Sequence, residues 1–411
     1  MLFISLVANA FLASILAAPP PLEFRETVVA GGGPGDFMEV RHLSLRGSNS
    51  DIGRKLAEIA RDRFGAKPAP SRDPLVVRAQ RAFLAKNWPA QLERMRGVAA
   101  FHGGRLEDDA IDYGSLDFLL GGAPGCSVVH YPPGRTKAGT GVVSRNYDFT
   151  TGTIAGAAPG PGSPACTSRP IVLETRPDGG HATLAIVAYD LLGSAIDGIN
   201  SEGLTVALLA DDEIVERFPT EPTRGSAVGV GEIQVPRFLL ETCANAEEAK
   251  AALLSARQYY SFIPCHYLVA DRHGNAFVFE WSAGRNVAHF IDGRGEALIT
   301  TNFMRHLHPD AAALPREENP EGSFARYGTL AACAAEGPLS IDEIKAANAR
   351  VFARARARGA RPPARTLWHA LYVPEKRSLE VDFYLGEGGT EAPDGGAIGR
   401  RSGYKTFTLA E

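Results

Sequence analysis

The sequence predicts an α+β protein, in which a mainly helical N-terminal part precedes a long meander of antiparallel strands. In the first part, apolar residues such as Ile52, Leu56 and Ile59 recur at helical spacing. After residue 126 the apolar period changes towards two, and turn-forming sequences separate short apolar runs. Two antiparallel sheets covered by helices would accommodate this order of elements.

Helices are expected first, over residues 50–63, 73–86, 88–101 and 106–119. The Gly-rich stretch 31–35 is not followed by the Lys-Ser/Thr of a phosphate loop, so we interpret it as a flexible connector. The apolar faces of these helices must be buried away from water. We therefore expect the helices to pack against the rest of the chain.

Strands dominate after residue 126. Residues 126–131, a Pro-Pro-Gly turn and residues 141–149 predict a β-hairpin. Further strands are expected at 171–175, 183–189, 204–210, 265–271, 276–281, 286–291 and 297–301, with a final pair at 367–373 and 378–385. Helices return at 234–243, 246–256 and 340–357, the last with Ser340 and Glu343 at the spacing of a capping box.

Composition limits the classes of function. The 411 residues are 45% apolar and 22% charged, which is enough for a large core in one big domain or two ordinary ones. A formal net charge of -4 gives no overall attraction to nucleic acid or to an anionic membrane. The basic run at residues 350–361 is interpreted as a solvated helix end.

The first residues have the pattern of a secretory signal peptide. Residues 2–18 are almost wholly apolar and end in small residues before three prolines, although no Lys or Arg precedes them. We expect residues 1–18 to be a signal, with an uncleaved anchor or a mis-assigned start as alternatives. The protein is then secreted or periplasmic. No later apolar run is long enough to span a bilayer, so no membrane association is expected after signal removal.

Export would permit disulfides. Setting Cys126 aside leaves Cys166, Cys243, Cys265 and Cys333, for which three full pairings are possible. Their wide spacing contains no Cys-x-x-Cys, so a structural zinc site is not expected, and the sequence implies no metal or other cofactor.

Cys126 is the candidate nucleophile. It follows a Gly/Pro-rich loop and opens an apolar run, Val128 to Tyr131. We interpret it as the first residue of a mature subunit, released by cleavage between Gly125 and Cys126, because a free α-amine with a pKa of about 8 supplies a base within the same residue. The chain would then divide into a helical prosegment, 19–125, and a catalytic subunit, 126–411.

Four motifs occur in the order and rough spacing of a known superfamily: Cys126, Arg145-Asn146-x-Asp148, Gly198 to Leu204, and Thr301-Asn302-Phe303. With them the chain resembles the N-terminal-nucleophile amide hydrolases, which include penicillin V acylases and bile salt hydrolases. It looks most like the isopenicillin-N acyltransferase branch, which has a long N-terminal prosegment. Residues 46–54 of this chain resemble the start of that prosegment.

The resemblance implies a four-layered αββα sandwich, a prosegment that stays bound as a second subunit, and cleavage of linear amides through a thioester. It places the Asn302 side-chain amide at the substrate oxyanion and Arg326 beside the nucleophile. Asn200 is interpreted mainly as a structural signature in a turn. Where bile salt hydrolases offer an asparagine to the oxyanion, this chain has Ala210, so bile salt activity is not expected and the second oxyanion donor is unassigned.

Two charged residues are expected to act on Cys126. Arg145 is the cation that would favour the thiolate, and Asp148 could accept a hydrogen bond from the α-amine. Residues three apart on an ideal strand lie on opposite faces. Both can therefore converge on Cys126 only if the strand ends or bulges near Asn146.

The expected activity is hydrolysis of a small-molecule amide or transfer of its acyl group, and the sequence leaves that choice and the oligomeric state open. The resemblance implies an apolar or aromatic acyl group, because the family handles such groups, and Tyr147 and Phe149 lie beside the expected site. One alternative is a papain-like thiol protease that uses His181 or His266, although the usual glutamine before the cysteine and aromatic residue after it are missing. Another is a secreted binding protein in which Cys126 is a half-cystine.

Overall fold

The computed structural model describes residues 21–117, 125–153, 164–211, 227–261, 263–282, 287–316, 322–354, 362–391 and 397–409. The expected signal peptide, the approach to the expected cleavage site at 118–124, and residues 355–361 of the basic run lie outside these ranges.

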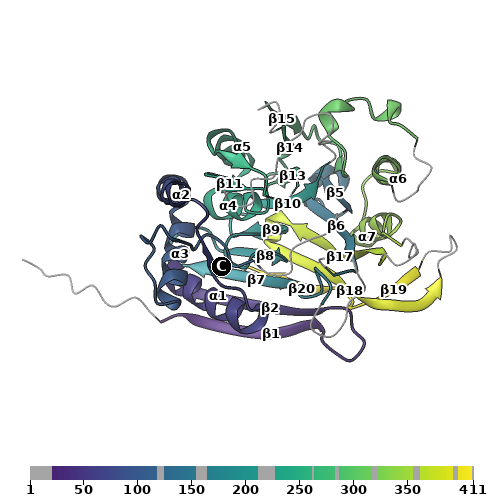
Figure 1. Ribbon diagram of the computed structural model, residues 1–411. Coiled ribbons are helices and arrows are strands. Elements are labelled where there is room, and N and C mark those ends of the chain that lie inside the picture. The colour runs from purple at the N-terminus through teal and green to yellow at the C-terminus, as the bar shows by residue number, and fades with distance from the viewer. Residues whose placement is uncertain are drawn as a thin grey trace, which may run out of the picture.

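Two β-sheets stack face to face, and helices cover both outer faces (Figure 1). On one side lie α1 (Asn49–Phe64), α2 (Pro74–Asn87), α3 (Pro89–Phe101), α4 (Val235–Thr242) and α5 (Ala246–Ser255). On the other lie α6 (Ser323–Ala335) and α7 (Ile341–Ala349). Buried apolar side chains fill each of the three spaces between these layers. The four-layered αββα sandwich is therefore confirmed.

The larger sheet has nine strands in the order β1-β2-β7-β8-β9-β10-β13-β14-β15. Their bounds are β1 Glu23–Gly31, β2 Glu39–Gly47, β7 Ile171–Pro177, β8 Thr183–Val187, β9 Asp197–Asn200, β10 Thr205–Ala210, β13 Cys265–Ala270, β14 Ala276–Ser282 and β15 Val287–Asp292. Neighbours are antiparallel except β2 and β7, which run parallel. Because β1 and β2 come from the N-terminal part, that part completes one edge of the sheet.

The second sheet carries the predicted hairpin. Its order is β16-β5-β6-β17-β18-β19, and β20 also pairs with β18. The bounds are β16 Leu298–Thr300, β5 Gly125–Tyr131, β6 Val142–Thr150, β17 Ala364–Val373, β18 Ser378–Glu391, β19 Ala397–Arg401 and β20 Lys405–Thr408. Two short pairs complete the list, β3 (Ala69–Pro70) with β4 (Ile111–Asp112) and β11 (Val230–Gly231) with β12 (Gln258–Tyr259).

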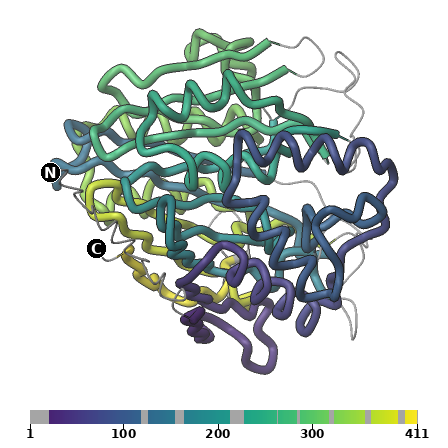
Figure 2. Tube along the Cα trace, turned by 90° about the vertical axis from the view of Figure 1, so that its left-hand side faces the viewer, coloured from purple at the N-terminus to yellow at the C-terminus, as the bar shows by residue number. Residues whose placement is uncertain are grey.

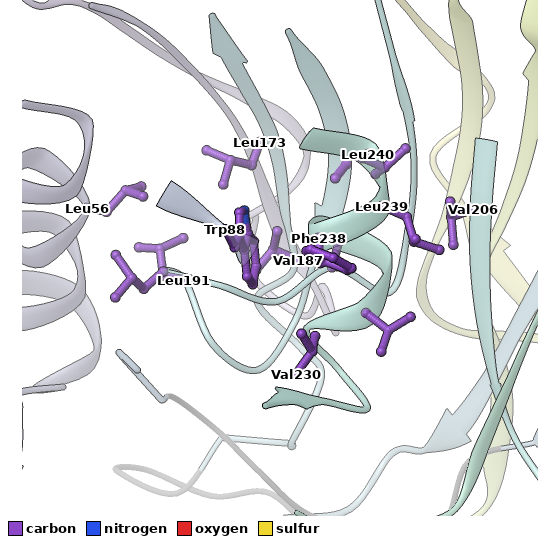
Figure 3. Packing of buried hydrophobic residues seen from close by; sticks show 14 of the residues in the cluster. Leu56, Trp88, Leu173, Val187, Leu191, Val206, Val230, Phe238, Leu239 and Leu240 are labelled. Carbon is purple, nitrogen blue, oxygen red and sulfur yellow. The ribbon is translucent and has the colours of Figure 1, made fainter. Parts of the chain in front are cut away.

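The N-terminal part shares one core with the rest of the chain. Trp88, between α2 and α3, packs against Phe238 of α4 with ring centroids 5.6 Å apart (Figure 3). Removing a buried aromatic side chain of this size costs about 3–5 kcal/mol. Figure 2 shows the purple and blue N-terminal segments running alongside the teal middle of the chain. The N-terminal helices therefore pack on the later residues of the chain.

Two predictions for the N-terminal part are wrong. Residues 106–117 form turns and β4 instead of a helix, because Asp108 and Asp112 accept hydrogen bonds from nearby backbone N–H groups and so favour turns over a helix. The stretch 31–35 is the turn of the β1–β2 hairpin and no flexible connector. Gly31 has φ 65°, and a Cβ there would lie 1.9 Å from the Met38 carbonyl oxygen, so only glycine fits.

Other elements differ in extent. The sequence analysis missed β1, β2, β9, β19, β20 and α6 together with the two short strand pairs, and α7 ends at Ala349, short of the predicted residue 357. Asn200 closes β9, and its side chain bonds to backbone groups of Leu240 and Cys243, which ties α4 to the sheet. Its structural role is thus as expected.

The cysteines and the helix lengths can be compared with the expectations. The described residues include all five cysteines, and each is a buried free thiol, so none of the possible disulfide pairings is formed. Within the described ranges, no helix combines the length and the apolar composition needed to cross a bilayer.

Candidate active site

Cys126 is the second residue of β5, and its side chain points into the space between the two sheets. It is fully buried. In the register of the β5–β6 hairpin, Cys126 lies opposite Tyr147, and Val128 lies opposite Arg145. Directly opposed residues share a face and side chains alternate along a strand. The thiol, Arg145 and Tyr147 are therefore on one face of the sheet.

Arg145 reaches the thiol directly. Its Nη2 lies 3.3 Å from Cys126 Sγ and also donates to the Leu208 carbonyl oxygen at 2.8 Å. Its Nη1 donates to the Asn146 carbonyl oxygen, and its Nε donates to Asp197 Oδ2 at 2.9 Å. All three guanidinium nitrogens are thus bound, and the side chain is fully buried. These contacts hold the planar guanidinium group of Arg145 in one orientation.

Burial and charge act in opposite directions on the thiol. Burial raises the pKa of Cys126, while the guanidinium of Arg145 opposes this rise. The carboxylate of Asp148 adds to the rise, and Arg326 lowers the pKa. The net direction is upward, so in the uninterrupted chain the sulfur is held mainly as the thiol.

Asn302 contacts the backbone nitrogen of Cys126. Its Oδ1 accepts hydrogen bonds from Cys126 N and from Arg326 Nη2, both at 2.7 Å, and its Nδ2 donates to the Ala210 carbonyl oxygen at 2.7 Å. Two donors at one end and a carbonyl at the other fix which end of the amide is oxygen. The nitrogen of the expected α-amine therefore lies against Asn302.

Arg326 and Asp148 approach from the opposite face. Arg326, on α6, donates through Nη1 to the Cys126 carbonyl oxygen, and the same nitrogen lies 3.8 Å from Asp148 Oδ2. Asp148 also accepts a hydrogen bond from Thr366. A Cβ placed on Gly125 would lie 3.4 Å from Asp148 Cβ, so the carboxylate is beside the expected cleavage site.

The expected break in the strand does not occur. β6 runs without interruption from Val142 to Thr150, and the irregularity lies on its neighbour β17, between Thr366 and Trp368. Arg145 and Asp148 occupy opposite faces of β6. The structure still brings all five predicted site residues together, because Arg145 contacts the sulfur while the others surround the backbone of Cys126.

Sequence reasoning missed three residues of this site. Asp197, Trp368 and Tyr372 are buried beside Arg145, and both aromatic residues donate hydrogen bonds to the Asp197 carboxylate. They come from β9 and β17, which are far from Cys126 in the chain. Asp197 directly precedes the Gly198–Leu204 motif, and this position was the one signal in the sequence that could have pointed to it.

The histidines are placed elsewhere. His266 lies 3.4 Å from the Thr300 hydroxyl and 3.8 Å from Glu280, and His181 lies in the turn between β7 and β8. In the described part of the chain, the side chain bonded to Cys126 Sγ is a guanidinium and not an imidazole. The described residues of the chain contain no group of three His, Cys, Asp or Glu side chains arranged to hold a metal ion.

Comparison with known families identifies the chain. The model of the acyl-coenzyme A:6-aminopenicillanic acid acyl-transferase family matches residues 135–388, which is more than half of the sequence. The chain belongs to this family. The matched region contains Arg145, Asp148, Asn302 and Arg326, and it begins nine residues after Cys126. Membership confirms the resemblance to the acyltransferase branch of the amide hydrolases, so the protein belongs to a family of acyl-transferring enzymes.

Similar solved structures are distant in sequence. A mutant of the conjugated bile acid hydrolase from Clostridium perfringens is 14% identical, with a TM-score of 0.46, over 69% of this chain and 97% of that one. Penicillin V acylase from Agrobacterium tumefaciens is 15% identical, with a TM-score of 0.40, over 63% and 83%. A Caenorhabditis elegans ortholog of N-acylethanolamine-hydrolyzing acid amidase is 18% identical, with a TM-score of 0.40, over 61% and 93%. The comparison with curated proteins gave no match.

Proposed function

We propose that this chain is a self-processing cysteine amidase or acyltransferase that cleaves linear amides through a thioester on Cys126. One observation carries the proposal: each reactive group of Cys126 has its own partner. The sulfur contacts Arg145, the nitrogen contacts Asn302, and the carbonyl oxygen contacts Arg326. The backbone of a structural cysteine in a strand interior would bond to neighbouring strands, and it would need no side-chain partner on its sulfur, nitrogen or carbonyl oxygen.

Self-cleavage begins at the Gly125 carbonyl carbon. The Cys126 sulfur attacks this carbon, the Gly125–Cys126 C–N bond breaks, and the thiol proton passes to the departing nitrogen. Water then hydrolyses the thioester, which frees the thiol and leaves a carboxylate on Gly125. The new α-amine lies beside Asn302 Oδ1, and it becomes the base that the uncut chain lacks.

Turnover repeats this chemistry on a substrate. The α-amine takes the thiol proton, the sulfur attacks the substrate carbonyl carbon, and the α-ammonium protonates the leaving amine. Asn302 Nδ2 donates one hydrogen to the Ala210 carbonyl oxygen, and its second hydrogen can be donated to the oxyanion of the tetrahedral intermediate. Such a donor is worth about 3 kcal/mol in the transition state. Water or a second amine resolves the thioester, so the product is a free acid or a new amide.

An apolar or aromatic acyl group fits the side chains on the Cys126 face. Tyr147, opposite Cys126, stacks on Phe149 with centroids 5.6 Å apart and on Trp368 at 3.9 Å. The half-buried Tyr189 bonds to the Tyr147 hydroxyl. Aromatic faces of this kind favour a flat or apolar acyl chain over a sugar or a nucleotide.

We also propose that residues 1–18 are a removed signal, which makes the protein secreted or periplasmic. Residues 19–125 then remain bound to 126–411 as a second subunit. The parallel pairing of β2 with β7 and the core around Trp88 support this retention.

The test of function is turnover together with detection of the acyl-enzyme. We would assay N-acyl amino acids, penicillins and acyl-homoserine lactones with the purified protein and with Cys126→Ala. The proposal predicts turnover of at least one apolar acyl amide and, after an acid quench, an added acyl mass on the peptide that contains Cys126. Undiminished turnover by Cys126→Ala, or a processed and folded enzyme inactive on the whole panel, would contradict it.

A further inference from the structure

Asp197 is the buried carboxylate that faces the site from the other sheet. It lies at the start of β9 in the nine-stranded sheet, whereas Arg145 lies on β6 of the second sheet. Asp197 Oδ2 accepts from Arg145 Nε at 2.9 Å, and both side chains have 0% exposure. The ion pair therefore joins the two sheets directly beside the thiol.

The carboxylate is itself held by the second sheet. Trp368 Nε1 donates to Asp197 Oδ2 at 3.1 Å, and the Tyr372 hydroxyl donates to Asp197 Oδ1. These two residues lie four apart on β17, on the face that points at the other sheet. With hydrogen bonds from Arg145, Trp368 and Tyr372, the carboxylate has a single orientation. The fixed carboxylate in turn fixes the orientation of the Arg145 guanidinium.

Charge gives Asp197 a second effect. A guanidinium is costly to bury unless a carboxylate accompanies it, and Asp197 is the carboxylate at hydrogen-bond distance from Arg145. Without that negative charge, the full field of Arg145 would act on the sulfur 3.3 Å away. The thiolate would form more easily, but the guanidinium would lose the charge-assisted hydrogen bond that orients it towards the sulfur.

We propose that Asp197 is a positioning residue that orients Arg145 towards Cys126 and balances its charge. This inference rests on the proposed role of Cys126 as the nucleophile. Trp368 and Tyr372 then fix the orientation of the Asp197 carboxylate. The residues that set the charge around the thiol come from β6 and β17 of one sheet and from β9 of the other.

The test is the Asp197→Asn variant, which keeps the size and can keep the hydrogen bonds but removes the charge. The Cys126 titration is followed by thiolate absorbance in the ultraviolet, after subtraction of the Cys126→Ala signal, on the protein as purified. We expect the midpoint to fall by about one pH unit. We expect kcat to fall by about threefold or more, because a neutral amide holds the guanidinium less firmly than a carboxylate, with KM within about twofold of wild type.

A matched control and a second variant complete the test. Asp382, on β18, is also a buried carboxylate paired with an arginine, Arg401. Asp382→Asn should leave the titration midpoint and kcat unchanged. If Asp197→Asn does not fold, Tyr372→Phe decides, because it removes one hydrogen bond and keeps the charge. It should lower kcat by about twofold or more at constant KM.

The two proposals fail separately. An unchanged Cys126 midpoint in folded Asp197→Asn, or wild-type kcat in Tyr372→Phe, overturns the role of Asp197 even if Cys126 is the nucleophile. The titration needs no substrate. A shifted midpoint in a protein that turns over no amide therefore supports the coupling of Asp197 to Cys126 and counts against the proposed activity alone.

Discussion

Arg145 uses its guanidinium to join four different groups. Its three nitrogens contact the Cys126 sulfur, the Asp197 carboxylate and the backbone oxygens of Asn146 and Leu208. Burial opposes its charged form, but Cys126 and Asp197 raise the pKa of Arg145 overall. The residue is therefore a permanent, directed cation beside the thiol, which a flexible ammonium cannot imitate.

Arg145→Lys should lower kcat by about a hundredfold although it preserves the charge, because one ammonium cannot hold the sulfur, the carboxylate and two carbonyls together. The measurement is steady-state kinetics combined with the Cys126 titration. A variant with wild-type kinetics and an unchanged thiol midpoint would remove Arg145 from the site.

Local motifs predicted part of this site and missed another part. Cys126, Arg145, Asp148, Asn302 and Arg326 were found because each lies in a short motif with recognisable neighbours. Asp197, Trp368 and Tyr372 were missed because they reach Arg145 only through the stacking of two sheets, and no residue spacing encodes that stacking. Strand geometry predicts that Arg145 and Asp148 point to opposite faces. It does not predict their contacts, because Arg145 reaches groups on β5, β9 and β10 whereas Asp148 lies near Arg326 of α6.

Among the elements, the β5–β6 hairpin was predictable and α6 was not. Alternating apolar residues and a Pro-Pro-Gly turn mark the hairpin. Helix α6 begins after Gly322 with no side-chain cap hydrogen bond, so its start has little signal. Strand β1 was missed because charged and apolar residues are mixed along it and only Ala30 of its nine residues is buried, so that its composition at the edge of the sheet resembles that of a linker.

Helix α3 is joined to α4 by a buried cluster of charges. Glu241 accepts hydrogen bonds from Trp88 Nε1 at 2.7 Å, from Arg94 Nη2 at 2.7 Å and from Arg237 Nε at 2.6 Å. Burial opposes ionisation of Glu241, but Arg94 and Arg237 lower its pKa overall. The cluster crosses from the expected prosegment to the catalytic part.

Glu241→Gln should destabilise the protein by about 3–5 kcal/mol, because two arginines remain buried without their carboxylate. Urea unfolding measures this loss, and native mass spectrometry of the processed protein should show the two subunits separating at lower urea. Glu247→Gln is the control. Glu247 pairs with Lys250 but is 78% exposed, and exposed pairs contribute little. Equal midpoints for Glu241→Gln and wild type would refute the anchoring role.

For the molecule as a whole, two buried histidines contribute to the loss of stability in acid. Burial lowers the pKa of His130 to about 4 and that of His369 to about 3. In the unfolded chain both titrate near 6.5. The unfolded state therefore binds more protons than the folded state below that pH, so stability is present above about pH 6.5 and is lost as the pH falls towards these folded values.

The free energy of unfolding should thus fall by about 1.4 kcal/mol per pH unit for each histidine between roughly pH 6 and pH 4. Urea unfolding at a series of pH values measures the slope. His369→Gln should reduce the slope by the share of one histidine, even if it lowers stability at pH 7. A slope that is the same in the variant would show that His369 is already protonated in the folded protein.

If Cys126 acts as the first residue of a subunit, intact mass and N-terminal sequencing of the purified protein will show it. We expect two co-purifying chains, the smaller ending at Gly125 and the larger beginning at Cys126. Cys126→Ala should remain one uncut chain, and Cys126→Ser should be cut slowly and have little activity, because a hydroxyl is a poorer nucleophile than a thiolate. An active enzyme whose chain is continuous through Gly125 and Cys126 would show that the nucleophile needs no free α-amine.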